Sequence, residues 1–370
     1  PARTLLRASG FGAQAKTEVA AFRATLQQLG WTEGRNLQTE LRWAGGTVKQ
    51  IQSHAQELVA LAPDVLVPRT TPATAALHQA TRSIPIVFIG ASDPVGAGFA
   101  ASIARPGGNV TGFTNAEASL GGKWVEVLKE INPRISRIAV IFDPNTSPGR
   151  GLFYLQLVQN AAKSVGLEAL ATPVHDAASI KHAVERFAAE PNGGLLVQPD
   201  VTIHTNRELV ISLAARHRLP AVYTFGFYVS EGGLASYGVD SVDLHRRAAS
   251  YVDRILRGEK PGQLAVQGPV KFDLAINLKT ARTLGLTLPP TLIARADQVI
   301  DDVGHGHIAS FRWKRQSGRF LIEADIAPIY EYTAWQTQGA SRRGEPYPRS
   351  SATHSLQTFI NRANALGKYH

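Results

Sequence analysis

The chain contains no cysteine and no methionine among its 370 residues. Without cysteine it has no disulfide, no thiolate zinc site and no cysteine nucleophile. Long hydrophobic runs are also lacking. The longest, such as IPIVFIGA and RIAVIF, are strand-sized and fall well short of the roughly 20 residues of a membrane span. The opening residues, PARTLLRASG, lack the charged start and long apolar segment of an export signal, which was either removed or never present.

The charge is strongly basic but spread along the chain. The formal net charge is +10, and the densest groups, FRWKRQSGR and SRRGEPYPR, lie near the C-terminus. A nucleic-acid binder concentrates such charge in a patch, so we expect no nucleic-acid partner. With 44% hydrophobic residues the composition is that of a globular protein. A length of 370 residues favours two domains.

Two stretches of the chain follow the same order of elements. The first has a helix ending at Gly30, the strand NLQTELRWA, a helix with Thr47 as N-cap, the strand DVLVP, the loop RTTPAT, a helix and the strand IPIVFIG. The second has a helix ending at Gly166, the strand LEALATPV, a helix, the strand GGLLVQP, the loop DVTIHTN, a helix and the strand PAVYTFG. RTLLRAS and RIAVIFDP are the strands that precede the two series.

This alternation predicts βαβ units and parallel sheets. The predicted fold class is therefore α/β, with two doubly wound, Rossmann-like lobes. We assign residues 1–115 to lobe 1, with part of 240–275 returning to it, and 116–240 to lobe 2, with part of 270–300. We interpret residues 303–370 as a poorly ordered C-terminal extension, because their periodicity is weak.

Motifs that carry catalysis or bind cofactors are largely missing. SGFGAQAK has no third glycine for a dinucleotide fingerprint, GGK is followed by Trp124 instead of Ser or Thr, and no Gly-x-Ser-x-Gly is present. The pair His305 and His307 lacks the further ligands of a metal site. We therefore expect no enzyme, no metal and no cofactor.

Small polar residues recur where the predicted strands end, and aromatic residues stand near them. In open α/β sheets, ligands bind outside the carboxyl ends of the strands, and a few placed polar groups among aromatic walls suit a small organic molecule. The candidate ligand-binding residues are Ser9, Thr70, Thr71, Ser92, Asp93, Asp143, Asn145, Asp200, Phe225 and Tyr237.

Four longer stretches together carry a family resemblance. They are AAFRATLQQLGWTEGRNLQTELRWA, IPIVFIGASDPVGAGFAASIARPGGNVTGFTN, GGKWVEVLKEINPRISRIAVIFDPN and VKFDLAINLKTARTLGLTLPPTLIARADQVI, and they span most of residues 22–300. The chain resembles the substrate-binding proteins of ABC transporters that have the periplasmic binding protein type I fold. Within them it is most similar to a broad group related to aromatic- and branched-chain-amino-acid binders.

The resemblance implies two lobes joined by a three-strand hinge that close on a small ligand. It implies delivery of that ligand to an ABC permease and its ATPase, a periplasmic location, contact with the membrane only through the permease, and a monomer. It places Asn115, together with Thr70, Thr71, Asp93, Asp143, Asn145 and Asp200, along the cleft. Hydroxyls and backbone N–H groups would take a carboxylate of an amino-acid-like ligand, and an Asp would take its ammonium group.

Two other interpretations stay open at this point. A ligand-sensing module of the same fold would use the same cleft, and a two-lobe enzyme acting on a small metabolite would need an acid and a base facing each other across it. The identity of the ligand is also open, since aromatic and branched amino acids, purine-like bases and small carboxylates all fit these residue types.

Overall fold

The computed structural model describes residues 2–9, 13–44, 48–302, 307–316 and 319–328. Thr47, the predicted helix cap, lies outside these residues. The chain divides into two compact units, Pro1–Val299 and Ile300–His370. The lobes and the site described below all belong to the first unit.

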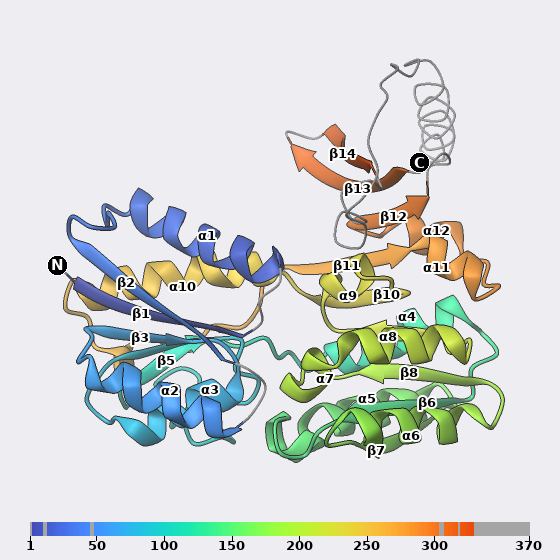
Figure 1. The fold of residues 1–370 in the computed structure, drawn as a ribbon, viewed down its shortest axis with the longest axis horizontal. Coiled ribbons are helices and arrows are strands. Elements are labelled where there is room, and N and C mark those ends of the chain that lie inside the picture. The colour runs from blue at the N-terminus through green and yellow to red at the C-terminus, as the bar shows by residue number, and fades with distance from the viewer. Residues whose placement is uncertain (1, 10–12, 45–47, 303–306, 317–318, 329–370) are drawn as a thin grey trace, which may run out of the picture. The chain divides into compact units, whose positions relative to one another are not determined.

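The first sheet is parallel throughout and has the strand order β2-β1-β3-β4-β5 (Figure 1). Its strands are β1 (Ala2–Ser9), β2 (Leu37–Ala44), β3 (Val65–Pro68), β4 (Ile86–Ile89) and β5 (Val110–Phe113). The connecting helices are α1 (Ala13–Gln28), α2 (Val48–Ala60) and α3 (Thr71–Ala80). We call this sheet with its helices lobe 1.

The second sheet repeats this topology. Its parallel strands have the order β7-β6-β8-β9-β10, and β11 pairs with β10 in the antiparallel direction. The strands are β6 (Arg137–Phe142), β7 (Glu168–Pro173), β8 (Gly193–Val197), β9 (Ala221–Tyr223), β10 (Ala235–Val239) and β11 (Phe272–Asn277). Numbered from the first strand of each, both sheets have the order 2-1-3-4-5, so the repeated order of elements in the sequence corresponds to a repeated topology.

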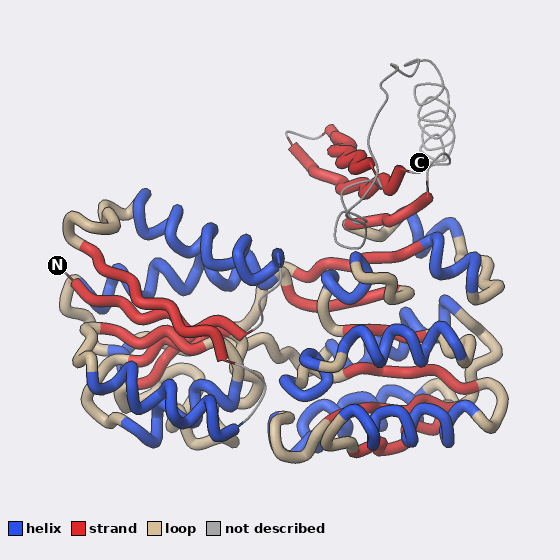
Figure 2. The backbone as a smooth tube through the Cα atoms, viewed as in Figure 1, coloured by secondary structure: helices blue, strands red, loops and turns tan. Residues whose placement is uncertain are grey.

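Helices enclose the second sheet, and we call the sheet with these helices lobe 2. They are α4 (Leu120–Ile131), α5 (Leu152–Ser164), α6 (Ala177–Ala188), α7 (Val201–Thr205), α8 (Arg207–Arg216), α9 (Gly226–Ser230), α11 (Leu278–Thr283) and α12 (Pro290–Ala294). A 3₁₀ turn, Pro148–Gly151, leads into α5, and another, Pro261–Gln263, precedes β11. Figure 2 shows the alternation of strands and helices along the chain.

Both faces of each sheet are covered, as the unbroken apolar strands predict. In β6, Ile138 and Val140 pack in one hydrophobic cluster, while the intervening Ala139 and Ile141 pack in another. Successive side chains of a strand point to opposite faces, so a strand buried on both faces shows no alternation of polar and apolar residues. The predicted α/β fold class is confirmed.

A long helix from the later part of the chain completes lobe 1. This is α10 (Ser241–Leu256), whose Leu244, Ala248 and Val252 share a buried cluster with Phe22 and Leu26 of α1. Its apolar residues recur at helical spacing and bury one stripe of the helix. Figure 1 shows α10 beside α1, although more than 200 residues separate them in sequence.

The segments that cross between the lobes are joined by backbone hydrogen bonds. Thr114 N–H donates to Gln267 O at 2.9 Å, Gln267 N–H donates to Gly112 O at 2.9 Å, and Asp240 N–H donates to Lys271 O at 3.1 Å. The chain therefore passes between the lobes at the ends of β5 and β10 and before β11, which holds the two sheets side by side.

The last strands of the described chain lie at and beyond the boundary between the two units. β12 (Gln298–Asp302) spans the boundary between the units, and in the second unit β13 (His307–Gln316) pairs antiparallel with β14 (Arg319–Pro328). Residues 329–370 lie outside the described part of the chain. Among the residues that were described, no helix combines the length and hydropathy that a bilayer crossing requires.

One predicted loop is a helix. The stretch DVTIHTN forms α7, because the carboxylate of Asp200 accepts the backbone N–H of Ile203 at 2.9 Å and caps the first turn. His204, one helical turn after Asp200, lines the same pocket as Asp200.

Candidate functional site

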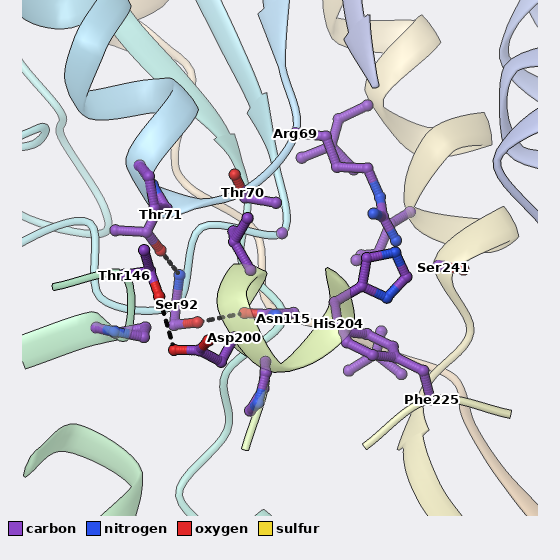
Figure 3. A pocket seen from close by; sticks show the side chains of 18 of the residues that line it. Arg69, Thr70, Thr71, Ser92, Asn115, Thr146, Asp200, His204, Phe225 and Ser241 are labelled. Atoms are coloured by element: carbon purple, nitrogen blue, oxygen red, sulfur yellow. Dashed lines mark hydrogen bonds between the residues drawn. The ribbon is translucent and has the colours of Figure 1, made fainter. Parts of the chain in front are cut away.

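A pocket lies between the carboxyl ends of the two sheets (Figure 3). It encloses about 760 Å³, its opening to solvent included. Lobe 1 contributes the loops after β3, β4 and β5, and lobe 2 contributes the loops after β6, β8 and β9. The loops after β3 and β8 occupy the point where the strand order of each sheet reverses, the place where α/β sheets bind ligands.

A buried hydrogen-bond network forms one wall of the pocket. Ser92 N–H donates to Thr71 Oγ1 at 3.1 Å, and Ser92 Oγ donates to Asn115 Oδ1 at 2.8 Å. The hydroxyl of Tyr154, from α5 of lobe 2, donates to Ser92 Oγ at 3.0 Å. Burial raises the pKa of Tyr154, so the phenol stays protonated and able to donate. The network holds hydroxyl and amide groups of lobe 1 in place and ties them to lobe 2.

Asp200 is the carboxylate of the opposite wall. Its Oδ2 accepts from Asp143 N–H at 3.1 Å and from the hydroxyls of Thr146 and Ser147, while Oδ1 accepts only from Ile203 N–H. Burial raises its pKa, against four hydrogen bonds that act to lower it. A carboxylate offers about four acceptor sites, so Oδ1 retains capacity for one more donor.

A buried ion pair lies at the other side of the pocket. The Arg69 guanidinium, at the end of β3, meets the Glu18 carboxylate of α1 with its Nε at 3.1 Å from Oε2 and its Nη2 at 3.2 Å from Oε1. The Glu18 side chain is 1% exposed and also accepts from Ser241 Oγ at 2.6 Å. Burial acts to raise the pKa of Glu18, but Arg69, His245 and the hydrogen bonds outweigh it and hold the pKa below its ordinary value.

Aromatic rings and two histidines complete this side. Phe225 and Phe227 stack at 5.5 Å, and the ring of His204 meets Phe227 edge-on at 5.0 Å. Burial, with Arg69 nearby, lowers the pKa of His204 to about 4. Burial also lowers the pKa of His245, and the neighbouring Glu18 carboxylate only partly offsets this. Both imidazoles are therefore neutral at pH 7.

The backbone at the pocket is strained at Thr70. Its φ of +86° falls in the region that side chains with a Cβ rarely adopt, at a cost of about 1–3 kcal/mol. The backbone hydrogen bond from Thr70 N–H to Ile89 O, at 3.1 Å, and the start of α3 at Thr71 hold this conformation. Such strain in a loop that lines a cavity is typical of a ligand-binding element.

The structure brings six of the predicted site residues together in the pocket lining. These are Thr70, Thr71, Ser92, Asn115, Asp200 and Phe225. Asp93 is next to Ser92 but does not line the pocket, because its Oδ1 accepts Gly96 N–H at 2.8 Å and closes the turn after β4. Ser9 is the last residue of β1, and its side chain is outside the described part of the structure.

The other three predicted residues support the surroundings of the pocket. Asp143 is 3% exposed and accepts from Asn145 N–H at 2.8 Å and from Thr202 Oγ1 at 2.7 Å, so it holds the loop after β6 against α7. The side chain of Asn145 faces His175 at the surface. Tyr237 stacks on Phe272 at 5.9 Å. None of the three lines the pocket.

Sequence reasoning missed several residues that do line it. They are Arg69, Thr146, His204, Ser241 and His245. Arg69 directly precedes the two threonines that the sequence pointed to, and His204 follows Asp200 by one helical turn. Glu18 gave no sequence signal, because its partners Arg69 and Ser241 are 51 and 223 residues away.

Within the described ranges, no group of three or more His, Asp or Glu side chains could hold a metal ion.

Residues 13–300 match the family model for ABC transporter substrate binding protein. The chain belongs to this family. The resemblance seen in the sequence is thereby confirmed, and the family is one of binding proteins that serve ABC transporters. Its match covers both lobes and the pocket between them.

The relatives of this substrate-binding protein support the same assignment. It is 27% identical over 265 residues to a tyrosine-binding protein of Clostridioides difficile (strain R20291), covering 72% of this chain and 75% of the relative. It is 30% identical to the crystal structure of a conserved domain protein of Vibrio cholerae, with a TM-score of 0.74 over 80% of this chain and 99% of that one.

A third comparison shows the fold. The structure of an ABC domain from Streptococcus pneumoniae in complex with L-Trp has a TM-score of 0.75 to this chain, at 24% identity over 81% of this chain and 99% of that one.

Proposed function

We propose that this protein is the substrate-binding component of an ABC importer and captures an amino-acid-like solute in the pocket between its lobes. It would deliver the solute to a membrane permease driven by an ATPase. We place it in the periplasm, as a monomer that meets the membrane only through the permease and performs no chemistry on its ligand. The observation that carries the proposal is a single pocket whose walls are formed by the strand ends of both lobes.

The polar side of the pocket suits the backbone groups of an amino acid. The hydroxyls of Thr70 and Thr71 lie at the start of α3 and would donate to the carboxylate. Among the described residues that line the pocket, Asp200 is the only carboxylate, and its Oδ1 has room for the ammonium group. An ammonium group there would favour the ionised form of Asp200 and so offset the effect of burial on its pKa.

The other side of the pocket suits an aromatic side chain. The stacked rings of Phe225 and Phe227 offer a flat apolar surface, and aromatic pairs prefer offset or edge-on contacts at about 4.5–7 Å. The likeness to a tyrosine-binding protein and to a domain solved with L-Trp supports the same class. We therefore propose an aromatic amino acid as the ligand.

Isothermal titration calorimetry tests this proposal. We expect L-tyrosine or L-tryptophan to bind with a Kd of micromolar order or tighter, and leucine and glutamate to bind at least tenfold more weakly. Asp200→Asn should weaken binding at least tenfold, because it removes the charge that meets the ammonium group. Asp93→Asn is the matched control and should bind as the wild type does. Mass spectrometry of the recovered ligand should show it unchanged.

Two results would contradict the proposal. One is the absence of heat and of a shift in melting temperature with any aromatic amino acid, since a ligand that binds only the native state raises Tm. The other is conversion of the ligand to a product, which would support a two-lobe enzyme instead.

A further inference from the structure

His204 is the polar group on the aromatic side of the pocket whose hydrogen-bonding capacity the fold leaves unused. It lines the pocket from α7, and its ring is held edge-on by Phe227 at 5.0 Å and by Tyr228 at 6.4 Å. Within the described ranges, its imidazole nitrogens form no hydrogen bond with the protein. Figure 3 shows the ring beside Phe225 and Arg69, on the side of the pocket away from Thr71 and Asp200.

The charges around His204 balance. Arg69 and Glu18 approach it from lobe 1, and these two are paired through two contacts of 3.1 and 3.2 Å. Arg207, on α8, also acts on it, and it is paired with Glu231 at 2.6 Å. His245 also approaches Glu18, with 3.8 Å between its Nε2 and Glu18 Oε2. Because each guanidinium has its own carboxylate, this side of the pocket presents no unbalanced charge to a ligand.

A neutral imidazole has one N–H donor and one acceptor nitrogen. Placed at the edge of an aromatic wall, it can serve a ring substituent that is polar and uncharged. A phenol hydroxyl can both donate and accept, and an indole N–H can donate. A phenyl ring would bury the two nitrogens without a partner, which carries a desolvation cost. A charged side chain would be buried without a free counter-ion.

We propose that His204 is the specificity-determining residue of the pocket: its imidazole forms a hydrogen bond with a neutral polar group on the aromatic ring of the ligand. The inference rests on the proposed function, because it assumes that an aromatic amino acid occupies the pocket. It adds that a ring carrying a hydroxyl or an N–H group is selected over a plain phenyl ring. The Arg69–Glu18 ion pair supports this selection, because its net charge beside His204 is zero.

Calorimetry with L-tyrosine, L-tryptophan and L-phenylalanine tests the inference at pH 7. The wild type should bind one or both polar rings at least tenfold more tightly than phenylalanine, as expected for one buried hydrogen bond. His204→Phe keeps a ring against Phe227 but removes both nitrogens. We expect it to weaken binding of the polar ring about tenfold and to leave phenylalanine binding unchanged or tighter. His204→Gln keeps a donor and an acceptor and should restore part of the preference.

His182→Phe, on the exposed face of α6, is the matched control and should bind all three ligands as the wild type does. The inference is overturned if the wild type binds phenylalanine as tightly as the polar rings, or if His204→Phe weakens all three ligands equally. In both cases aromatic amino acids still bind, so the proposed function stands. If no aromatic amino acid binds the wild type, both proposals fail together. Thermal melts of each variant without ligand show that the variants are folded.

Discussion

The hydroxyl of Tyr154 in lobe 2 donates a 3.0 Å hydrogen bond to Ser92 Oγ in lobe 1. Ser92 in turn donates to Asn115 Oδ1, and both residues line the pocket. A wholly buried phenol therefore couples the position of α5 to the polar wall on which a ligand would rest. The contact links the position of lobe 2 to the geometry of the site.

Replacing Tyr154 by Phe tests this coupling. The variant loses one buried hydrogen bond, and we expect the free energy of unfolding to fall by about 1–2 kcal/mol and ligand affinity to fall with it. Tyr251→Phe is the control, since its hydroxyl donates to Ala265 O at 2.7 Å and neither residue lines the pocket. It should lose similar stability in urea titrations but retain affinity. Equal affinities in the two variants would contradict the coupling.

The adjacent glycines of α4 offer a matched pair for a test of packing. A Cβ on Gly121 would lie 2.6 Å from the backbone carbon of Leu157, whereas one on Gly122 would meet no atom within 4 Å. Gly121→Ala should therefore separate α4 from α5 and cost about 2–4 kcal/mol. Gly122→Ala should be neutral or stabilise the helix by up to about 1 kcal/mol. Denaturant unfolding measures both, and a Gly121→Ala variant as stable as Gly122→Ala would show that α5 does not lie against α4 at this point.

The buried ion pair of Glu18 and Arg69 predicts a loss of stability in acid. The pKa of Glu18 is below its ordinary value of 4.5 in the folded protein, so its contribution is complete above about pH 4.5 and is lost as pH falls through the folded-state pKa. Glu18→Gln leaves Arg69 without its carboxylate and should cost about 3 kcal/mol at pH 7. The difference from the wild type should shrink below pH 4.5.

Glu259→Gln is the control for Glu18. Glu259 pairs with Arg254 at the surface, where ion pairs contribute little. Urea unfolding at pH 7 and pH 3.5 distinguishes the two positions. A difference between wild type and Glu18→Gln that does not change with pH would show that the charge of Glu18 is not what stabilises the folded protein.

His204 predicts a second pH dependence. Its pKa is about 4 in the folded protein, compared with an ordinary value of 6.5, so folding requires it to lose a proton between these values. As far as His204 is concerned, the free energy of unfolding is highest above about pH 6.5 and falls progressively as pH falls toward 4. Between pH 6.5 and 4 the free energy of unfolding should therefore fall less in His204→Gln than in the wild type. The difference between the two falls should reach up to about 3 kcal/mol.

His182→Gln should follow the wild type over the same interval, since His182 is exposed on α6. Other buried histidines, such as His245, contribute equally to the wild type and to each variant, so the comparison isolates His204. Parallel changes in the free energy of unfolding of wild type and His204→Gln from pH 6.5 to 4 would show that folding does not lower the pKa of His204.

Most of the fold could be predicted because its pattern is local. Unbroken apolar runs such as the one at Ile86–Ile89 predict strands covered on both faces, and helical spacing in stretches such as Val48–Ala60 predicts the connecting helices. The site was predicted only to the level of strand ends. Ser92 and Asp93 are equally polar neighbours, and the hydrogen bond from Gly96 N–H to Asp93 decides that Ser92 is the one that faces the pocket.

By itself, the sequence determined two similar parallel sheets and the edges at which a ligand can bind, because the period and order of its elements depend on neighbouring residues. Only the tertiary structure decided which side chains meet there. Glu18, Arg69 and Ser241 are brought together from α1, the end of β3 and α10, and His204 faces the pocket from a helix that Asp200 starts. Contacts over such sequence separations follow from how the lobes and helices pack, which no local pattern encodes.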